Sequence, residues 1–488
     1  MKRAGLVLAL SLAVVPALMI LAHTFAPALT ERYFVQRSEA FLAFYCAGSI
    51  AARGENPYRI QPLLDCEQAA GGGMISAGIV EPAPLPGYAL GFFSLFRALP
   101  YATAAMVWAT ILLMALVAAT WALARTTSLP WYLIAAALAP SAGHINIPFG
   151  EIPPFCIGAL SVSAYLLAQR RYTGAALAAS TLMLEPHVGL AACLGLFCFV
   201  PRARAPLAIL GILFASASIA TLGWGGNAEF LQTVLPAHAR SEVLAGDQYS
   251  LTWVLQEIGF PAELALRAGG ISYIVMLACG LFLARRWARS LKSRELIVVL
   301  PAAVVLIGGV FIHDIQMVIA LPAAIIIAAR STGTRSSLGF LGVLLIAIPW
   351  GSLLGHAGTL ALLSIALIAA LSLGGRFGRT TWARAASAGA ATAVVLSLAS
   401  MATPPAPPLS LPALRTPDAQ AAANWQQYIE GNTVPSTPAS VGRKLLVWSG
   451  FVVMLVAAAG GRGAGSPRSA TEPELEVYAE HPASTASA

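Results

Sequence analysis

The sequence predicts an all-α polytopic membrane protein, and three observations support this fold class. First, 58% of the 488 residues are hydrophobic and 10% are charged, with a mean hydropathy of +0.75, whereas a soluble chain has about a quarter charged residues. Second, many apolar runs approach the roughly 20 residues that a helix needs to cross a bilayer. Third, the basic residues behind the net charge of +8 stand in short clusters between these runs. This pattern is typical of cytoplasmic loops and not of a nucleic-acid-binding surface.

The first apolar segment begins with two basic residues, Lys2 and Arg3, and continues to residue 28. A basic start followed by an apolar stretch fits either a cleaved signal peptide or a membrane span. The apolar part is about 20 residues long, which exceeds the usual signal-peptide core and suffices for a span. We therefore expect an uncleaved first span with its N-terminus in the cytoplasm.

A polar loop covers residues 29–84 and is expected to include short amphipathic helices. It contains Cys46 and Cys66, whereas the other four cysteines lie inside apolar runs, where cysteine behaves as a small hydrophobic residue. If the loop faces an oxidising compartment, the two cysteines can form a disulfide. The alternative is two free thiols, and the sequence leaves both interpretations open.

The remaining apolar segments vary in length, and several are too short to cross a bilayer alone. We therefore expect re-entrant or broken helices and roughly 12–14 true spans. The segments lie near residues 86–98, 101–124, 130–143, 152–168, 172–184, 187–200, 205–223, 267–284, 296–312, 315–329, 336–350, 353–373, 385–402 and 445–460. The polar regions are a second loop at 224–266, a proline-rich loop at 403–444 and a disordered tail at 461–488.

Basic clusters determine the predicted orientation, because loops rich in Lys and Arg stay in the cytoplasm. The clusters lie at residues 169–171, 201–204, 285–294, 330–335 and 374–384. Counting spans from them places the loops at 29–84, 144–151, 185–187, 224–266, 313–314 and 403–444 on the extracytoplasmic (periplasmic) face of the plasma membrane. Arg125 conflicts with this count if both 86–98 and 101–124 are full spans. A re-entrant segment at 86–98 resolves the conflict.

His313 and Asp314 stand between two apolar runs, in the stretch FIHDIQM at 311–317. One interpretation is a polar turn between antiparallel spans, with Asp314 capping a helix that starts at Ile315. This accounts for the aspartate but not for the neighbouring histidine. It also leaves unexplained why other polar residues fall on the same predicted face.

These other polar residues come from four loops. They are Glu39, Tyr45 and Tyr58; His144, Asn146 and Glu151; Glu185 and His187; and Asp247, Gln248 and Ser250. For each residue taken singly, a structural role is the simpler interpretation. Together, histidines and carboxylates on one membrane face predict a substrate or catalytic cavity. Because the sequence has no Walker A, GxGxxG or HExxH pattern, we expect neither a nucleotide cofactor nor a metal site.

Five segments follow one another in the order of a known family. They read SEAFLAFYCAGSIAARGENPY, EPAPLPGYALGFFSLFRALP, GHINIPFGEIPPF with LEPHVGL, DQYSLTWVLQEIG and HDIQMVIALP. Over residues 30–325 they resemble the motifs of glycosyltransferase family 87 (DUF2029), whose members are polyprenyl-phosphate-mannose-dependent enzymes of the GT-C superfamily. In the first segment, the residues that match the family pattern are Phe41, Phe44, Tyr45, Ala47, Gly54, Pro57 and Tyr58.

The resemblance implies a GT-C-type bundle over residues 1–402 and an inverting hexosyl transfer, with mannose as the expected sugar. The donor would be a polyprenyl-phosphate sugar, and the acceptor a lipid or cell-envelope glycan. A carboxylate would act as general base on the acceptor hydroxyl, and hydrogen-bond donors or cations would stabilise the departing phosphate. The candidate bases are Glu39 and Asp314. The candidate binding residues are Tyr45, Tyr58, His144, Asn146, Glu151, Glu185, His187, Arg240, Gln248, Ser250 and His313.

The chain departs from the family pattern at two positions. The loop aspartate of the family falls on Ala40, with Glu39 adjacent, and the lysine of its KP motif falls on Glu185. His187, His238, Arg240 or His313 could replace the missing positive charge. The departures keep open a catalytically altered relative that acts as a membrane scaffold. A lipid or solute transporter is the other alternative, although we find none of the internal repeats that transporters commonly have.

Overall fold

The computed structural model describes residues 38–70, 79–348, 350, 420–432 and 438–459. Several predicted features therefore lie outside the described residues. They are the first span, the segments at 353–373 and 385–402, the basic cluster at 374–384, most of the proline-rich loop and the tail at 461–488. Within the described ranges, regular secondary structure is helical, and β-structure is limited to two isolated bridges. The predicted all-α class is confirmed for this part of the chain.

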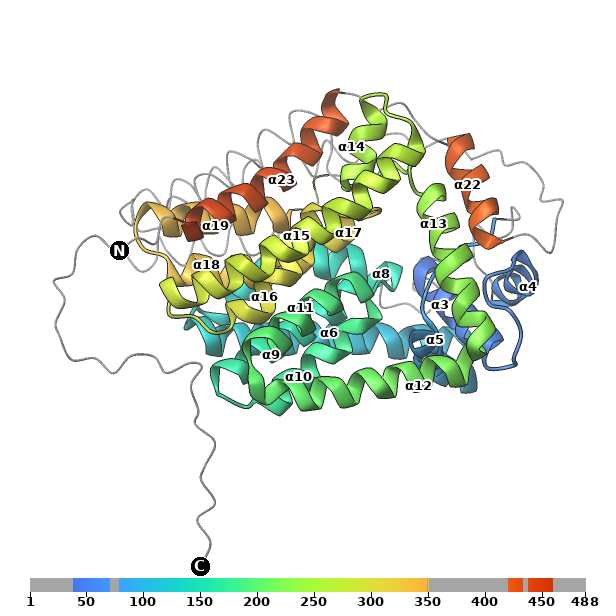
Figure 1. The fold of residues 1–488 in the computed structure, drawn as a ribbon, viewed down its shortest axis with the longest axis horizontal. Helices are drawn as coiled ribbons and strands as arrows, with labels where there is room; N and C mark the ends of the chain where they lie inside the picture. Colours follow the sequence, from blue (N-terminus) through green and yellow to red (C-terminus); the bar gives the residue numbers. More distant parts are fainter. Residues whose placement is uncertain (1–37, 71–78, 349, 351–419, 433–437, 460–488) are drawn as a thin grey trace, which may run out of the picture.

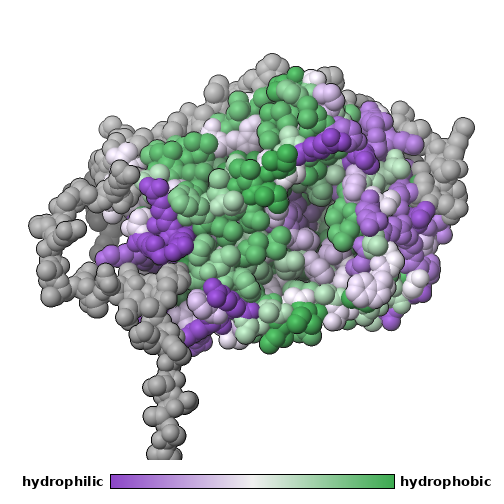
Figure 2. All heavy atoms as spheres, viewed as in Figure 1, coloured by the Kyte–Doolittle hydropathy of each residue, from purple (hydrophilic) through white to green (hydrophobic). Residues whose placement is uncertain are grey.

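Four of the described helices are long and apolar enough to cross a membrane. They are α6 (Tyr101–Thr127), α12 (Arg204–Glu229, within a helical run Pro201–Ser241), α15 (Ala262–Ser290) and most of α23 (Pro438–Ala459). In the most apolar window of α12, as in that of α15, 11% of the residues are buried. Exposed side chains include Ile212 of α12 and Ile271 of α15, and apolar surface covers much of the face in Figure 2. So much contiguous apolar surface is suited to contact with lipid, and the chain is a membrane protein.

Shorter helices fill the space between the long ones. They are α9 (Pro153–Ala168), α10 (Tyr172–Thr181), α11 (Pro186–Phe199), α16 (Leu296–Val304), α18 (Leu321–Arg330) and α19 (Thr334–Ala347), with short 3-10 turns η4 (Leu182–Leu184) and η5 (Pro201–Ala203). Every residue of α16 is buried, and this helix packs against α11, α15 and α18. Helices α6 and α9 approach closely, because a Cβ added at Gly158 would lie 2.8 Å from Ala115.

Proline and glycine interrupt several predicted segments. The segment at 296–312 stops being helical after η7 (Val305–Ile307), where Gly309 has a φ of 144°, a conformation that favours glycine. The segment at 315–329 is divided into α17 (Asp314–Met317), η8 (Val318–Ala320) and α18. At 130–143, α7 (Trp131–Leu138) continues into the proline-containing π-helix η3 (Ala139–Ile145) and then α8 (Asn146–Phe149). Irregular backbone thus lies beside two of the polar stretches that the sequence singled out.

The segment at 86–98 contains only short helices. They are α5 (Gly87–Phe93) and the 3-10 helix η2 (Ser94–Ala98), and neither is long enough to cross a bilayer. Both pack against α3 (Glu39–Ala51), and α5 also packs against α12. A re-entrant position for this segment is consistent with these lengths.

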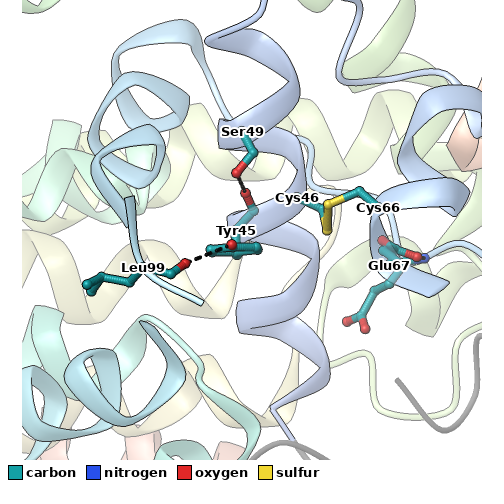
Figure 3. The surroundings of a disulfide bond; sticks show 7 residues. Tyr45, Cys46, Ser49, Cys66, Glu67 and Leu99 are labelled. Carbon is teal, nitrogen blue, oxygen red and sulfur yellow. Dashed lines mark hydrogen bonds between the residues drawn. A yellow bond between two sulfur atoms is a disulfide. The ribbon is translucent and has the colours of Figure 1, made fainter. Parts of the chain in front are cut away.

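Both polar loops contain helices, which were expected in the first loop but not in the second. The first loop contains α3 and α4 (Ile60–Ala70), which are joined by a disulfide between Cys46 and Cys66 (Figure 3). The region predicted as a loop at 224–266 holds the end of α12, then η6 (Phe230–Val234), α13 (Leu235–Ser241), α14 (Leu251–Glu257) and the start of α15. Its polar side chains argued against a membrane span, and the region was predicted to be a loop. In the structure these side chains lie on helices, of which α13 packs against α22 and α14 against α15.

Helix α22 (Ala421–Asn432) connects distant parts of the molecule. It packs against α4 and α13, and Figure 1 shows it beside α13 at one end of the fold. The N–H of Ala421 donates to the carbonyl of Tyr58 at 2.8 Å, and the side chain of Asn424 accepts from the N–H of Val80 at 2.8 Å. A segment that the sequence assigned to a proline-rich loop is therefore tied to the first loop and to α13. The last helix, α23, begins at Pro438 rather than at the predicted residue 445.

Candidate functional site

Two irregular stretches that are far apart in the sequence pair as an antiparallel bridge. Gln248 and His313 are the bridged residues. The N–H of Tyr249 donates to the carbonyl of Ile312 at 2.6 Å, and the N–H of Asp314 donates to the carbonyl of Asp247 at 3.0 Å. This pairing places the polar residues of GDQYSL directly beside those of FIHDIQM.

The bridge brings His313 into contact with two side chains from the other stretch. Its Nδ1 lies 3.0 Å from Oδ2 of Asp247, and its Nε2 lies 3.2 Å from Nε2 of Gln248. The Gln248 amide has a fixed orientation, because its oxygen accepts the N–H of Ile312 at 2.9 Å. The amide nitrogen is therefore a donor, so Nε2 of His313 accepts and Nδ1 donates to Asp247.

Carboxylates surround the same imidazole. Burial alone would lower the pKa of His313, but the charges of Asp247, Glu242 and Glu151 outweigh burial and raise that pKa to about 10. The pKa of Asp247 is lowered in return, because His313 outweighs the effect of burial. The lone pair on Nε2, which accepts the Gln248 amide when the imidazole is neutral, is thus strongly disposed to bind a proton.

Glu242, which directly follows α13, is the second carboxylate beside His313. It is 3% exposed. Its Oε1 accepts the indole N–H of Trp425 at 2.6 Å, and its Oε2 accepts from Gln248 at 3.4 Å. Oε2 also lies 3.8 Å from Nε2 of His313. Burial raises the pKa of Glu242, and the charge of His313 opposes this increase.

A second polar group adjoins the first through Gln316. Its side-chain oxygen accepts the N–H of His313 at 2.9 Å, and its amide donates to Glu185 at 3.3 Å. Glu185 in turn lies 3.7 Å from Nδ1 of His187. Helix α17 therefore starts at Asp314 with His313 as its N-cap, which corrects the expectation that Asp314 caps a helix starting at Ile315.

Glu151 links this site to the loop after α8. Its pKa is raised to about 8, mainly by burial and then by the carboxylates of Glu185, Asp247 and Asp314, while the charge of His313 opposes the increase. These interactions show that residues from four separate polar stretches share one electrostatic environment. Figure 2 shows the surface hollowed between α13 and α15, over α8, with polar side chains in the hollow.

Some predicted site residues have structural partners elsewhere. The hydroxyl of Tyr45 donates to the carbonyl of Leu99 at 3.0 Å, and that of Tyr58 donates to the carbonyl of Leu85 at 2.7 Å. Ser250 is the N-cap of α14 and accepts the N–H of Trp253 at 3.2 Å. These three residues therefore help to position the backbone, and none of these contacts joins the His313 cluster.

Among the described residues, two other candidates have side-chain contacts that do not involve the same cluster. Arg240 pairs with Glu263 at 3.2 Å, with both side chains more than half exposed. Asn146 is buried, and its amide donates to the carbonyl of Ser141 at 3.0 Å. The backbone of His144 belongs to η3, and its side chain is not among those described.

The candidate base Glu39 belongs to a second group of carboxylates. It is the first residue of α3, and its charge helps to raise the pKa of Glu81. The charges of Glu67, Glu151 and Glu242 act on Glu81 as well. The charge of Glu39 and that of Glu242, a neighbour of His313, therefore both act on Glu81.

Several residues of the site were missed in the sequence. Glu242 and Trp425 lie in regions read as loops, and Lys444 lies at a loop boundary. Lys444 is buried, and its Nζ donates to the carbonyl of Gln248 and lies 3.6 Å from the centre of the Trp253 ring. Glu242 could have been noticed from the sequence, because it precedes Asp247 by five residues in the same polar stretch. The partners from 420–459 could not be found from the sequence, because they are about 180–200 residues away.

Comparisons with protein-family models, with curated proteins and with solved structures found no match to this chain.

Proposed function

We propose that the chain is an integral membrane glycosyltransferase of the GT-C type. It would move a hexose, with mannose as the expected sugar, from a polyprenyl-phosphate donor to a lipid or cell-envelope glycan. The main support is the convergence of Glu151, Glu185, Asp247 and His313 on one site. They come from three of the five segments of the family resemblance, with Glu151 and Glu185 both in the third. A site of this kind beside helices that contact lipid suits a reaction between a lipid-linked donor and a polar acceptor.

The reaction requires a carboxylate that acts as general base and a cation or hydrogen-bond donor that stabilises the departing phosphate. In the reaction, the acceptor oxygen forms a bond to C1 of the sugar, on the face opposite the phosphate. The bond between C1 and the phosphate oxygen breaks, and the polyprenyl phosphate leaves with its electron pair. The acceptor hydroxyl proton passes to the general base. The sugar donor is a substrate, so no cofactor is needed for the group transfer itself.

Asp314 is one of two candidates for the base. It lies in the cluster, beside the bridge, and it lines a small cavity with Ser141 and Tyr249. Burial, and next the charge of Asp247, raise the pKa of Asp314 to about 6. A carboxylate with such a pKa remains mostly ionised at neutral pH and is more basic than an ordinary aspartate. Glu39 is the other candidate, and its charge acts on the nearby carboxyl of Glu81.

The departing phosphate needs positive charge, and this site has little. The family lysine is replaced by Glu185, and Arg240 pairs with Glu263 away from the cluster. Among the described residues, the nearby cationic groups are His313, Lys444 and Arg443. Lys444 already contacts Gln248 and Trp253, and the charge of Arg443 acts on Tyr249. This shortage favours, as the second candidate function, a catalytically altered relative that serves as a membrane scaffold.

Sugar transfer in isolated membranes tests the proposal. Membranes with the wild-type chain would receive radiolabelled polyprenyl-phosphate mannose and native lipid extract. We expect label in a lipid or glycan product, and a loss of about 100-fold or more in either Asp314→Asn or Glu39→Gln. The matched control is Glu430→Gln, an exposed residue of α22 that hydrogen-bonds Gln426 of its own helix.

The variant that loses sugar transfer while remaining folded identifies the general base. If folded wild-type protein transfers no label from mannose or other hexose donors, the transferase is excluded. The scaffold or transporter alternatives then become the leading explanations. The missing activity would be explained by Ala40 and Glu185, which replace the aspartate and the lysine of the family pattern.

A further inference from the structure

Three metal-binding side chain types meet at the cluster: those of Glu242, Asp247 and His313. One ligand atom from each lies within 4.8 Å of the other two. His313 approaches Asp247 through Nδ1 at 3.0 Å and Glu242 through Nε2 at 3.8 Å, and a single ion would bind one of these two nitrogens. Ligand atoms bound to a single Zn²⁺ at about 2.0–2.2 Å lie up to roughly 4.4 Å apart. Small side-chain movements would therefore bring all three onto one ion.

A buried imidazole next to this cluster has no hydrogen bond among the described residues. His238 is 6% exposed, and its Nδ1 has no hydrogen-bond partner. Its Nε2 faces Oε1 of Glu242 at 3.9 Å, which is too long for a hydrogen bond. Buried polar groups are rarely left unpaired in native proteins. The protein groups around Glu242 thus leave a polar side chain available to an additional occupant.

The charge around the cluster also favours a cation. Glu151, Glu185 and Asp314 act on the same region as Glu242 and Asp247. Among the described residues, the cations near them are His313, Lys444 and Arg443. Lys444 donates to a backbone carbonyl and lies over the Trp253 ring, and the charge of Arg443 acts on Tyr249. Several carboxylates this close repel one another unless they are protonated or share a cation.

We propose that Glu242, Asp247 and His313 form a binding site for a divalent transition-metal ion, with Zn²⁺ as its expected occupant. The imidazole favours Zn²⁺ over Mg²⁺ and Ca²⁺, which prefer sites made of oxygen ligands alone. Asp247 is 52% exposed, so an ion can reach the site from solvent. No metal-ligand motif with short spacing marks this site in the sequence, because Asp247 and His313 are 66 residues apart.

The role of the ion rests on the proposed transferase function. A divalent ion at this position would supply positive charge for the departing phosphate, where the family lysine is replaced by Glu185. Metal binding itself does not depend on that function, because the ligands are present whatever the substrate is. The two proposals can therefore be tested separately.

Zinc binding by the full-length, tag-free protein in detergent is the direct test. After treatment with EDTA and removal of the chelator, Zn²⁺ would be titrated by calorimetry, and bound metal measured by mass spectrometry. We expect one equivalent of tightly bound Zn²⁺, and binding at least 10-fold weaker in Asp247→Asn, Glu242→Gln and His313→Gln. Asp247→Asn is the key variant, because an exposed side chain can be replaced with little effect on folding.

The control is Glu263→Gln, an exposed carboxylate outside the cluster, which should bind Zn²⁺ as the wild type does. Visible absorption of bound Co²⁺ provides a second readout of imidazole and carboxylate ligation. The proposal is overturned if the wild type binds no saturable equivalent, or if folded Asp247→Asn and His313→Gln bind as tightly as Glu263→Gln. If the site binds Zn²⁺ while membranes transfer no sugar, the metal site stands and the transferase function fails.

Discussion

At the scale of single residues, the site combines groups whose ordinary charge states conflict with burial. His313 has Asp247 at 3.0 Å on one ring nitrogen and Glu242 at 3.8 Å from the other. The Gln248 amide faces Nε2 at 3.2 Å, and the backbone N–H of Ile312 orients that amide. An imidazole held in this way is preorganised to bind a cation or to face a phosphate, and it does not reorient when the substrate arrives.

Glu67 offers a test of burial away from the proposed chemistry. It lies in α4, beside the Cys46–Cys66 disulfide (Figure 3), and it is 0% exposed. One carboxyl oxygen accepts the N–H of Glu81 at 3.4 Å, and the other has no hydrogen-bond partner among the described residues. Burial raises the pKa of Glu67 well above its usual value, and the Glu81 N–H opposes this increase. The folded state therefore retains a proton that the unfolded chain releases at lower pH.

This difference sets the sign of a pH dependence. The contribution of Glu67 is most favourable below the unfolded pKa and is lost as the pH rises toward the folded pKa. Glu67→Gln cannot lose that proton, so we expect the variant to be more stable than the wild type at pH 8, by about 1–3 kcal/mol. Unfolding temperatures from pH 5 to pH 9 measure the effect, with the exposed Asp65→Asn of the same helix as control. Equal pH profiles for Glu67→Gln and the wild type would contradict it.

At the scale of elements, the first loop is organised by covalent and tertiary links rather than by its own helices. Helices α3 and α4 are joined by the disulfide, and α3 packs against α5. The C-terminal helix α22 adds contacts with Tyr58 and Val80. Since Trp425 of α22 also donates to Glu242, the position of this carboxylate depends on a helix far away in sequence.

The disulfide should contribute substantially to stability. Cys46 and Cys66 are 20 residues apart, and closing a loop of this length restricts the unfolded chain by about 3 kcal/mol. We expect Cys66→Ser to lower the unfolding temperature, and a reducing agent to lower that of the wild type to a similar value. The exposed, free Cys279 provides the control Cys279→Ser, which should leave the unfolding temperature unchanged. A wild-type protein that is insensitive to reduction would argue against this contribution.

At the scale of the whole molecule, composition predicted the class, and tertiary pairing determined the site. The segments at 101–124 and 152–168 were recognisable because apolar runs of that length have few other structures available. The polar region at 224–266 was read as a loop, because single-sequence patterns do not reveal which helices face a polar interior. The bridge between Gln248 and His313, and the contact of Trp425 with Glu242, depend on long-range packing. Sequence periodicity contains no information on such contacts.

Lipid should cover the surface that α15 leaves exposed. Cys279 lies inside this helix and is exposed on the chain itself. In a variant whose other free cysteines are serine, we expect a membrane-impermeant maleimide to leave Cys279 unlabelled in intact membranes, because the thiol lies in the hydrocarbon region. Detergent should make it reactive. Glu257→Cys in the same background is the control, since Glu257 is exposed at the end of α14. It should be labelled from outside if the 224–266 region is extracytoplasmic. Equal labelling of Cys279 and Glu257→Cys in intact membranes would mean that α15 does not lie in the bilayer.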